Sequence, residues 1–175
     1  MVIGISGRIH SGKSTLANEM AERMCIPKVS FGSFLRRYSE VNSLDLTRIS
    51  LQDLGQNFVD NSLDEFCNLV LNEGGWDKET NLIVDGIRHI SVLDKLKELV
   101  KPQKFILIFI EVSDEELAKR DIEYQDKQRK IFEQHLTEIQ VISKLKSFAD
   151  IVVLPEYSVS DILVKINALI ENNLL

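Results

Sequence analysis

One stretch near the start of the chain reads Gly7-Arg8-Ile9-His10-Ser11-Gly12-Lys13-Ser14 and fits the pattern G-x-x-x-x-G-K-[ST]. An apolar segment, residues 2–5, precedes it, and an amphipathic segment follows from Lys13. This order predicts a strand, a tight loop and a helix. Glycines at two positions let the loop turn so that consecutive N–H groups point into one concavity, and the helix adds the positive end of its dipole. The stretch therefore predicts a phosphate cradle.

The side chains around the second glycine indicate what this cradle would hold. Lys13 has the length to reach the β- and γ-phosphates of a nucleotide, and the Ser14 hydroxyl is a ligand for the magnesium ion that accompanies them. We therefore expect ATP to bind along the quoted loop and at the next residue, Thr15, with Mg²⁺ beside it.

Length and composition limit the class of protein. A chain of 175 residues suits a single domain, 1–175, and 44% hydrophobic with 27% charged residues is ordinary for a globular protein. The net charge of −6 argues against coating a nucleic-acid polymer, which requires a basic face. The longest apolar run, residues 105–110, is too short to span a membrane, and the first residues lack the features of a signal peptide. We expect a cytoplasmic enzyme acting on a small molecule, as a monomer or homodimer.

The cysteines and histidines do not form a metal-binding pattern. Cys25 and Cys67 are far apart among apolar neighbours, which favours small core residues over a disulfide or a zinc site. His10 falls in the loop, His89 follows a predicted strand and His135 lies in a polar segment, so that structural roles are expected for all three.

Strand-like runs alternate with helical runs along the chain, which is typical of a parallel sheet covered on both faces. Strands are expected at residues 2–5, 28–31, 81–85, 105–112 and 151–154.

Helices are expected between these strands. One runs from Lys13 until Pro27 ends it, and residues 48–72 are helical with a break at Asn61-Ser62. Residues 91–100 form a helix capped at Ser91. The pairs Ser62 with Glu65 and Ser113 with Glu116 resemble capping boxes. A closing helix carries an apolar face formed by Val159, Ile162, Leu163, Ile166, Leu169 and Ile170.

Residues just after the strands are the best candidates for ligand contact, because open α/β sheets bind ligands beyond the carboxyl ends of their strands. Asp85 ends a buried strand, where its carboxylate can hold a magnesium-bound water. A turn at Gly32-Ser33 leads to Arg36 and Arg37, and Arg88 follows Asp85 closely. Guanidinium groups match phosphate oxygens, so these arginines predict a second anionic site. Arg37 is expected to point away, since adjacent helical residues do not share a face.

The segment from residue 115 to residue 146 is long, charged and poor in glycine. Arg120, Lys127, Arg129 and Lys130 concentrate there. We expect the segment to stand partly off the body of the domain.

Two strand-end segments resemble those of adenylate kinases. Residues 31–36, Phe-Gly-Ser-Phe-Leu-Arg, resemble the T-G-D-x-L-R turn whose arginine binds the acceptor's phosphate, and Asp85-Gly86-Ile87-Arg88 is similar to D-G-x-P-R. The later segments are similar to those of phage-type deoxynucleoside monophosphate kinases. Residues 48–56 resemble their R-x-x-x-Q-x-L-G segment, and residues 135–138 resemble H-x-T-E.

The resemblance implies a three-layer P-loop fold of the nucleoside monophosphate kinase type, with a five-stranded parallel sheet. It also implies a helical acceptor-binding region near residues 33–72 and a lid near residues 115–135. Within that fold, the implied catalytic residues are Lys13, Arg88, Arg120 and Arg129. The implied acceptor-binding residues are Ser33, Arg36 and Arg88, and the implied magnesium site consists of Ser14 and, through water, Asp85.

Transfer of the γ-phosphoryl group of MgATP to a nucleoside or deoxynucleoside monophosphate is the activity we expect. An acceptor phosphate needs no general base, because its second pKa is ~6. Two alternatives stay open. A hydroxyl kinase of the dephospho-coenzyme A kinase type would need Asp85 to accept the proton, and a regulatory module would hydrolyse ATP weakly with no acceptor effect. Ser33 stands where the family has an aspartate, so that no carboxylate is available at this position to serve as a base. This favours a phosphate acceptor over a hydroxyl acceptor.

Overall fold

A computed structural model describes residues 1–124, 138, 141, 144–154 and 156–172. Its centre is a five-stranded parallel sheet, as expected, and the strand order is β2-β3-β1-β4-β5. The strands are β1 (Val2–Gly7), β2 (Lys28–Ser30), β3 (Leu82–Asp85), β4 (Phe105–Ile110) and β5 (Ile151–Val153).

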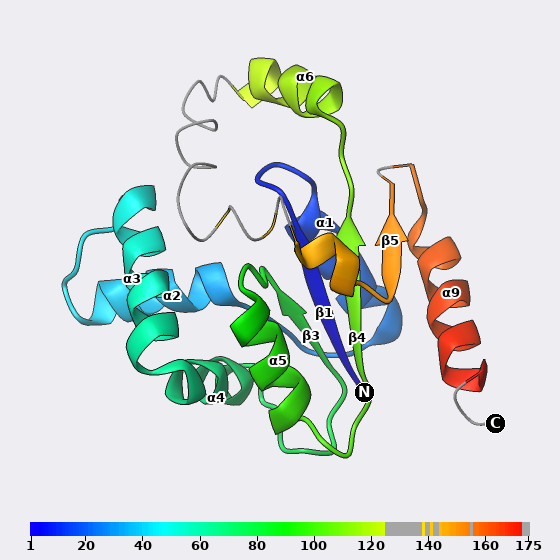
Figure 1. Ribbon diagram of the computed structural model, residues 1–175, viewed down its shortest axis with the longest axis horizontal. Helices are drawn as coiled ribbons and strands as arrows, with labels where there is room; N and C mark the ends of the chain where they lie inside the picture. The colour runs from blue at the N-terminus through cyan, green and yellow to red at the C-terminus, as the bar shows by residue number, and fades with distance from the viewer. Residues whose placement is uncertain (125–137, 139–140, 142–143, 155, 173–175) are drawn as a thin grey trace.

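Helices cover both faces of this sheet (Figure 1). They are α1 (Lys13–Met24), α2 (Phe31–Val41), α3 (Arg48–Asn61), α4 (Leu63–Glu73), α5 (Ile90–Leu99), α6 (Asp114–Tyr124) and α9 (Val159–Asn172), with a 3₁₀ turn, η1 (Leu145–Phe148). The predicted break at residues 61–62 separates α3 from α4.

Two hydrophobic cores form because alternate strand residues face opposite sides of the sheet. On one face, Val2, Val84 and Leu107 pack with α2, α4, α5 and η1. On the other face, Ile3 and Ile108 pack with α1 and α9, and the predicted apolar face of α9 lies in this second core. Strands buried on both faces explain why the sequence shows continuous apolar runs there.

Several helix starts differ from the sequence prediction. Helix α2 begins at Phe31, because the Ser30 hydroxyl accepts a hydrogen bond from the Ser33 N–H, so Gly32 and Ser33 lie in its first turn and not in a loop. Helix α5 begins one residue before Ser91, so the prediction that Ser91 caps it was wrong: His89 is the N-cap. The capping box predicted at Ser62 is wrong, since its side chain makes no capping hydrogen bond, whereas the Ser113 hydroxyl accepts from the Glu116 N–H at 3.2 Å.

The two cysteines have different environments. Cys67 is fully buried in the core, as predicted. The prediction for Cys25 was wrong: it is exposed in a left-handed conformation (φ 53°) that ends α1, which turns its side chain away from the core.

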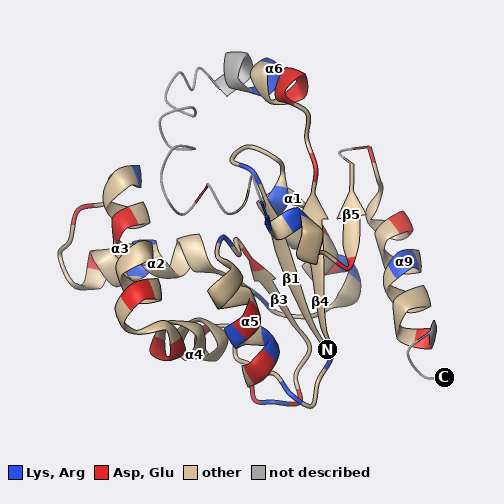
Figure 2. Cartoon of the chain, viewed as in Figure 1, with Lys and Arg blue, Asp and Glu red and all other residues tan. Residues whose placement is uncertain are grey.

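Charge is mixed over the surface of the described residues. Basic and acidic residues both occur along α5 and along α9 (Figure 2). None of the helices in the described part of the chain combines the length and apolar character needed to cross a membrane.

Candidate active site

The loop between β1 and α1 has the backbone geometry that a phosphate cradle requires. Gly7 has a φ of +149°, and a Cβ placed there would lie 2.8 Å from the Ile110 carbonyl oxygen. Gly12 adopts a left-handed conformation (φ 92°) as the N-cap of α1. Both positions therefore favour glycine, and the first amides of α1 are left to point out of the helix end, where they attract anions.

Lys13 folds back over this loop. Its Nζ donates a hydrogen bond to the Arg8 carbonyl and lies 3.5 Å from the Ser11 Oγ. The residue is 8% exposed, so its ammonium group is held at the loop and not in open solvent. A phosphate bound by the helix amides would meet this ammonium.

Ser14 and Asp85 meet at the edge where β1 and β3 end. Asp85 pairs in register with Ile5, and its Oδ2 accepts a hydrogen bond from the Ser14 hydroxyl at 2.8 Å. Asp85 is 2% exposed, and its Oδ1 is buried with no hydrogen-bond partner among the described residues. A buried carboxylate oxygen beside a hydroxyl fits a hydrated Mg²⁺, which prefers oxygen ligands and keeps several waters. The described residues contain no group of three or more His, Cys, Asp or Glu side chains able to hold a metal by themselves.

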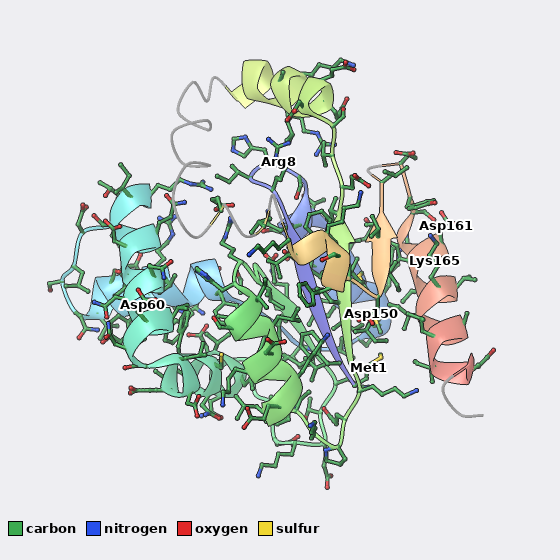
Figure 3. All side chains as sticks on the ribbon, in the orientation of Figure 1. Met1, Arg8, Asp60, Asp150, Asp161 and Lys165 are labelled. Atoms are coloured by element: carbon green, nitrogen blue, oxygen red, sulfur yellow. The ribbon has the colours of Figure 1, made fainter. Side chains whose placement is uncertain are left out.

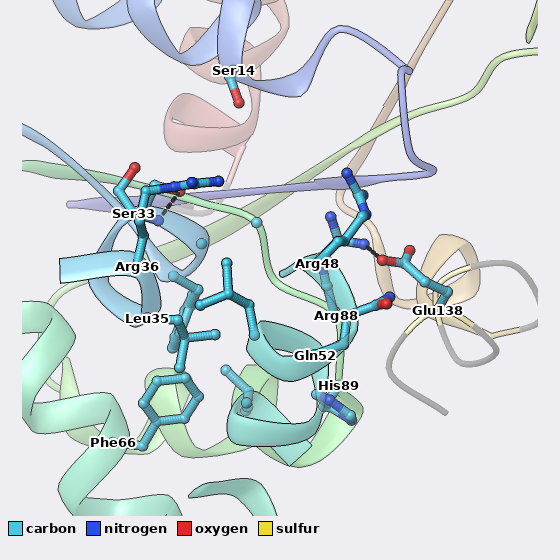
Figure 4. Close-up of a pocket in the computed structure, with 17 residues that line it drawn as sticks. Ser14, Ser33, Leu35, Arg36, Arg48, Gln52, Phe66, Arg88, His89 and Glu138 are labelled. Atoms are coloured by element: carbon cyan, nitrogen blue, oxygen red, sulfur yellow. Dashed lines mark hydrogen bonds and ion pairs between the residues drawn. The ribbon is translucent and has the colours of Figure 1, made fainter. Parts of the chain in front are cut away.

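A cavity of about 430 Å³ opens next to Ser14 (Figure 4). The walls come from the first turn of α1, from α2, α3, α4 and α5, from the segment after β3, and from Glu138. Its lining includes Ser14, Ser30, Phe31, Gly32, Ser33, Leu35, Arg36, Arg48, Leu51, Gln52, Gly55, Phe66, Gly86, Arg88, His89, Val92 and Glu138.

Three arginines from three different elements line this cavity. Arg36 lies on α2, Arg48 on α3, and Arg88 follows β3. In Figure 4 their side chains lie between Ser14 and the part of the cavity that contains Phe66. The pKa of Arg88 is lowered to about 10, first by burial and then by the positive charge of Arg48, while Asp85 acts in the opposite direction. Arg88 remains protonated near neutral pH, and an anion bound beside it would stabilise that charge.

The expected difference between Arg36 and Arg37 is confirmed. Arg37 forms an ion pair with Glu73 on α4, and its side chain is 53% exposed. It does not line the cavity that Arg36 lines. These adjacent residues of α2 therefore have different roles: Arg36 faces the cavity, whereas Arg37 links α2 to α4.

Three further polar residues of the cavity had no assigned role in the sequence analysis. Arg48 and Gln52 lie four residues apart on α3, a spacing that places both on one face of the helix and could have identified them. Gly55 follows on the same helix, where a Cβ would lie 3.1 Å from Leu35 Cδ1, so glycine allows α3 to approach α2 closely. Glu138, which forms an ion pair with Arg88, comes from a segment distant in sequence.

Helix α6 touches the phosphate loop from above. Arg120 Nη1 donates to the His10 carbonyl at 3.0 Å, and Arg8 Nη1 lies 2.6 Å from Asp114 Oδ1. Figure 3 labels Arg8 between this loop and α6. Arg120 is therefore placed beside the expected phosphate site. Arg129 and His135, with the rest of the expected lid beyond residue 124, lie outside the described residues.

This arrangement defines the P-loop class of nucleotide-binding proteins, in which a strand leads through a glycine-bounded loop into a helix. Comparison with protein families agrees: the family model described as "AAA domain" (AAA_18) matches residues 3–140, and the chain belongs to this family.

Relatives and solved structures refine the class. The chain is 26% identical over 140 residues to a cytidylate kinase of Pyrobaculum neutrophilum and 29% identical over 140 residues to one of Pyrobaculum islandicum; each match covers 80% of this chain and 67% of the relative. A gluconokinase structure from Sinorhizobium meliloti 1021 has a TM-score of 0.59 at 16% identity, covering 94% of this chain and 87% of that one. Shikimate kinase from Aquifex aeolicus vf5 has a TM-score of 0.53 at 20% identity, with 99% and 98% covered. The chain is a P-loop kinase by family and fold.

Lys13 gives the first test of the site. Replacing Lys13 with Ala should lower turnover by about 10²–10³-fold, because the ammonium group stabilises charge that develops on the transferring phosphates. ADP formation would be measured with the acceptor present, together with thermal unfolding. Lys101→Ala is the matched control, since Lys101 is exposed and precedes β4 at the opposite end of the sheet. A folded Lys13→Ala variant with the turnover of that control would remove Lys13 from the catalytic site.

Proposed function

We propose that this kinase transfers the γ-phosphoryl group of ATP to the phosphate of a nucleoside or deoxynucleoside monophosphate. The observation that carries the proposal is the composition of the cavity beside Ser14: three arginines line it together with an apolar wall. A ligand that combines an anionic group with a flat, partly apolar ring would match the arginines with the first and the apolar wall with the second.

The apolar wall comes from Leu35, Leu51, Phe66 and Val92, and Gly32 and Gly55 also line the cavity. A volume of about 430 Å³ is in the range of small-molecule sites, which bury most of their ligand against apolar groups. A nucleobase presents apolar faces and a polar edge, and Gln52 and His89 supply polar groups in the same cavity. The curated relatives, cytidylate kinases by name, support a monophosphate acceptor.

In this proposal the donor phosphates lie on the phosphate loop, with Lys13 against their oxygens. Ser14 and Asp85 would hold Mg²⁺, which supplies charge neutralisation to the transferring group. Arg36 and Arg88 hold the acceptor phosphate in line with the donor, so that positioning and electrostatics carry the catalysis. Arg120, at the loop's outer edge, and Arg129 are proposed to add positive charge at the same phosphates.

No side chain has to remove a proton from the acceptor. The second pKa of a phosphate monoester is ~6, so that its oxygens are largely ionised near neutral pH. A hydroxyl acceptor would instead require Asp85 as a base. In the structure, Asp85 Oδ2 already accepts a hydrogen bond from the Ser14 hydroxyl, which suits a role beside Mg²⁺.

A panel of acceptors tests the proposal directly. The protein is incubated with MgATP and each of the ribo- and deoxyribonucleoside monophosphates, and in parallel with dephospho-coenzyme A, gluconate, shikimate and no acceptor. Chromatography of both nucleotides measures the products. We expect at least one monophosphate to be converted to its diphosphate. Phosphorylation of a hydroxyl acceptor alone, or ADP release that no acceptor stimulates, would overturn the proposal.

Arg36 and Arg37 form a matched pair for the acceptor site. Arg36→Ala should lower kcat/KM for the acceptor by ~10–100-fold, because a hydrogen bond to a charged group contributes ~1.5–3 kcal/mol. The affinity for ATP should stay within about twofold of wild type, since the donor keeps Lys13 and the loop amides. Arg37→Ala, which removes only the contact with Glu73, should leave both parameters close to wild type. Equal losses for ATP and acceptor in Arg36→Ala would exclude Arg36 from the acceptor site.

A further inference from the structure

Glu138 places a carboxylate in a cavity that otherwise favours anions. The side chain is 1% exposed and lines the cavity beside Arg88 and Gln52. One oxygen, Oε1, is paired with Arg88 Nη1. The other oxygen, Oε2, is buried and has no hydrogen-bond partner among the described residues.

A buried oxygen of this kind needs a donor, because an ionised carboxylate accepts hydrogen bonds and gives none. The acceptor's phosphate cannot supply one, as it also carries negative charge. An O–H or N–H group on another part of the same ligand would supply this donor.

The position of Glu138 indicates whether the donor is a sugar hydroxyl or a group on the base. Its Oε1 contacts Arg88, the arginine that follows Asp85 and Gly86 at the phosphate end of the cavity. The part of a nucleoside monophosphate next to its phosphate is the sugar, and the base lies one ring further on. A sugar hydroxyl is thus the nearest donor to a carboxylate in contact with the phosphate-binding arginine.

We infer that Glu138 is a specificity-determining residue that accepts a hydrogen bond from the 3′-hydroxyl of the acceptor's sugar through Oε2. The inference rests on the proposed monophosphate acceptor and adds how the sugar is recognised. The 3′-hydroxyl is common to ribose and deoxyribose, so both kinds of monophosphate satisfy Glu138. Through Oε1 the same carboxylate positions Arg88, which joins recognition of the sugar to recognition of the phosphate.

The test compares each accepted deoxynucleoside monophosphate with its 2′,3′-dideoxy analogue, which differs only at the 3′-hydroxyl. Wild-type protein should prefer the 3′-hydroxyl form by at least ~10-fold in kcat/KM, because a site built around a hydroxyl rejects the analogue that lacks it. Glu138→Ala should bring this ratio close to one. Glu73→Ala is the matched control, since Glu73 also pairs with an arginine but lies outside the cavity lining; it should keep the wild-type ratio.

The ratio of kcat/KM for the two acceptors shows whether Glu138 recognises the 3′-hydroxyl or only supports Arg88. If Glu138 only holds Arg88, its removal lowers kcat/KM for both acceptors equally and the ratio persists, which would overturn the inference. Equal use of the two acceptors by wild-type protein would also overturn it, whether or not the variant folds. A changed preference among bases with an unchanged sugar ratio would assign Glu138 to the base. Absence of any phosphorylated monophosphate would overturn the proposed function and this inference together, whereas the other outcomes leave the proposed function standing.

Discussion

The parallel pairing of β1 with β3 is the constraint on which the site depends. Ile5 and Asp85 stand in register, and the N–H groups of Gly86 and Ile87 both donate to the Ile5 carbonyl, at 3.0 and 3.2 Å. Parallel strands end at the same edge of a sheet, so the phosphate loop after β1 and Arg88 after β3 emerge side by side. One edge therefore carries the Ser14–Asp85 contact and the beginning of the proposed acceptor cavity.

Packing of aromatic side chains holds the outer wall of that cavity. Phe58 on α3 and Phe66 on α4 stack with ring centroids 4.8 Å apart, and Phe66 contacts Phe31 at 5.0 Å edge to face. Tyr38 on α2 meets Phe58 at 5.1 Å. These contacts join the three helices that lie beyond the sheet edge and so set the separation of Arg36 from Arg48, which come from different helices. The proposed acceptor site is thus supported by an aromatic cluster that belongs to the first hydrophobic core and lies away from the loop that would hold the donor.

Much of the sheet and of the phosphate loop could be predicted from the sequence, because both are local patterns. Buried strands appear as continuous apolar runs, and the spacing of Gly7, Gly12 and Lys13 describes one loop. The four-residue spacing of Arg48 and Gln52 indicates a shared helix face, but the approach of Arg48 and Glu138 to Arg88 could not be predicted from such local patterns, since it depends on how distant segments pack. For Cys25 a local pattern gave the wrong prediction. Its apolar neighbours indicated burial, but the left-handed conformation at the end of α1 turns its side chain outward.

We propose that the donor and acceptor phosphates occupy neighbouring sites in one cleft of one chain. A ligand in which two nucleosides are joined through five phosphates would fill both sites at once, and calorimetric titration would measure its affinity and stoichiometry. We expect one molecule per chain, bound at least ~100-fold more tightly than ATP, because joining two ligands makes the second binding event intramolecular. Binding no tighter than that of ATP, or two molecules per chain, would contradict it.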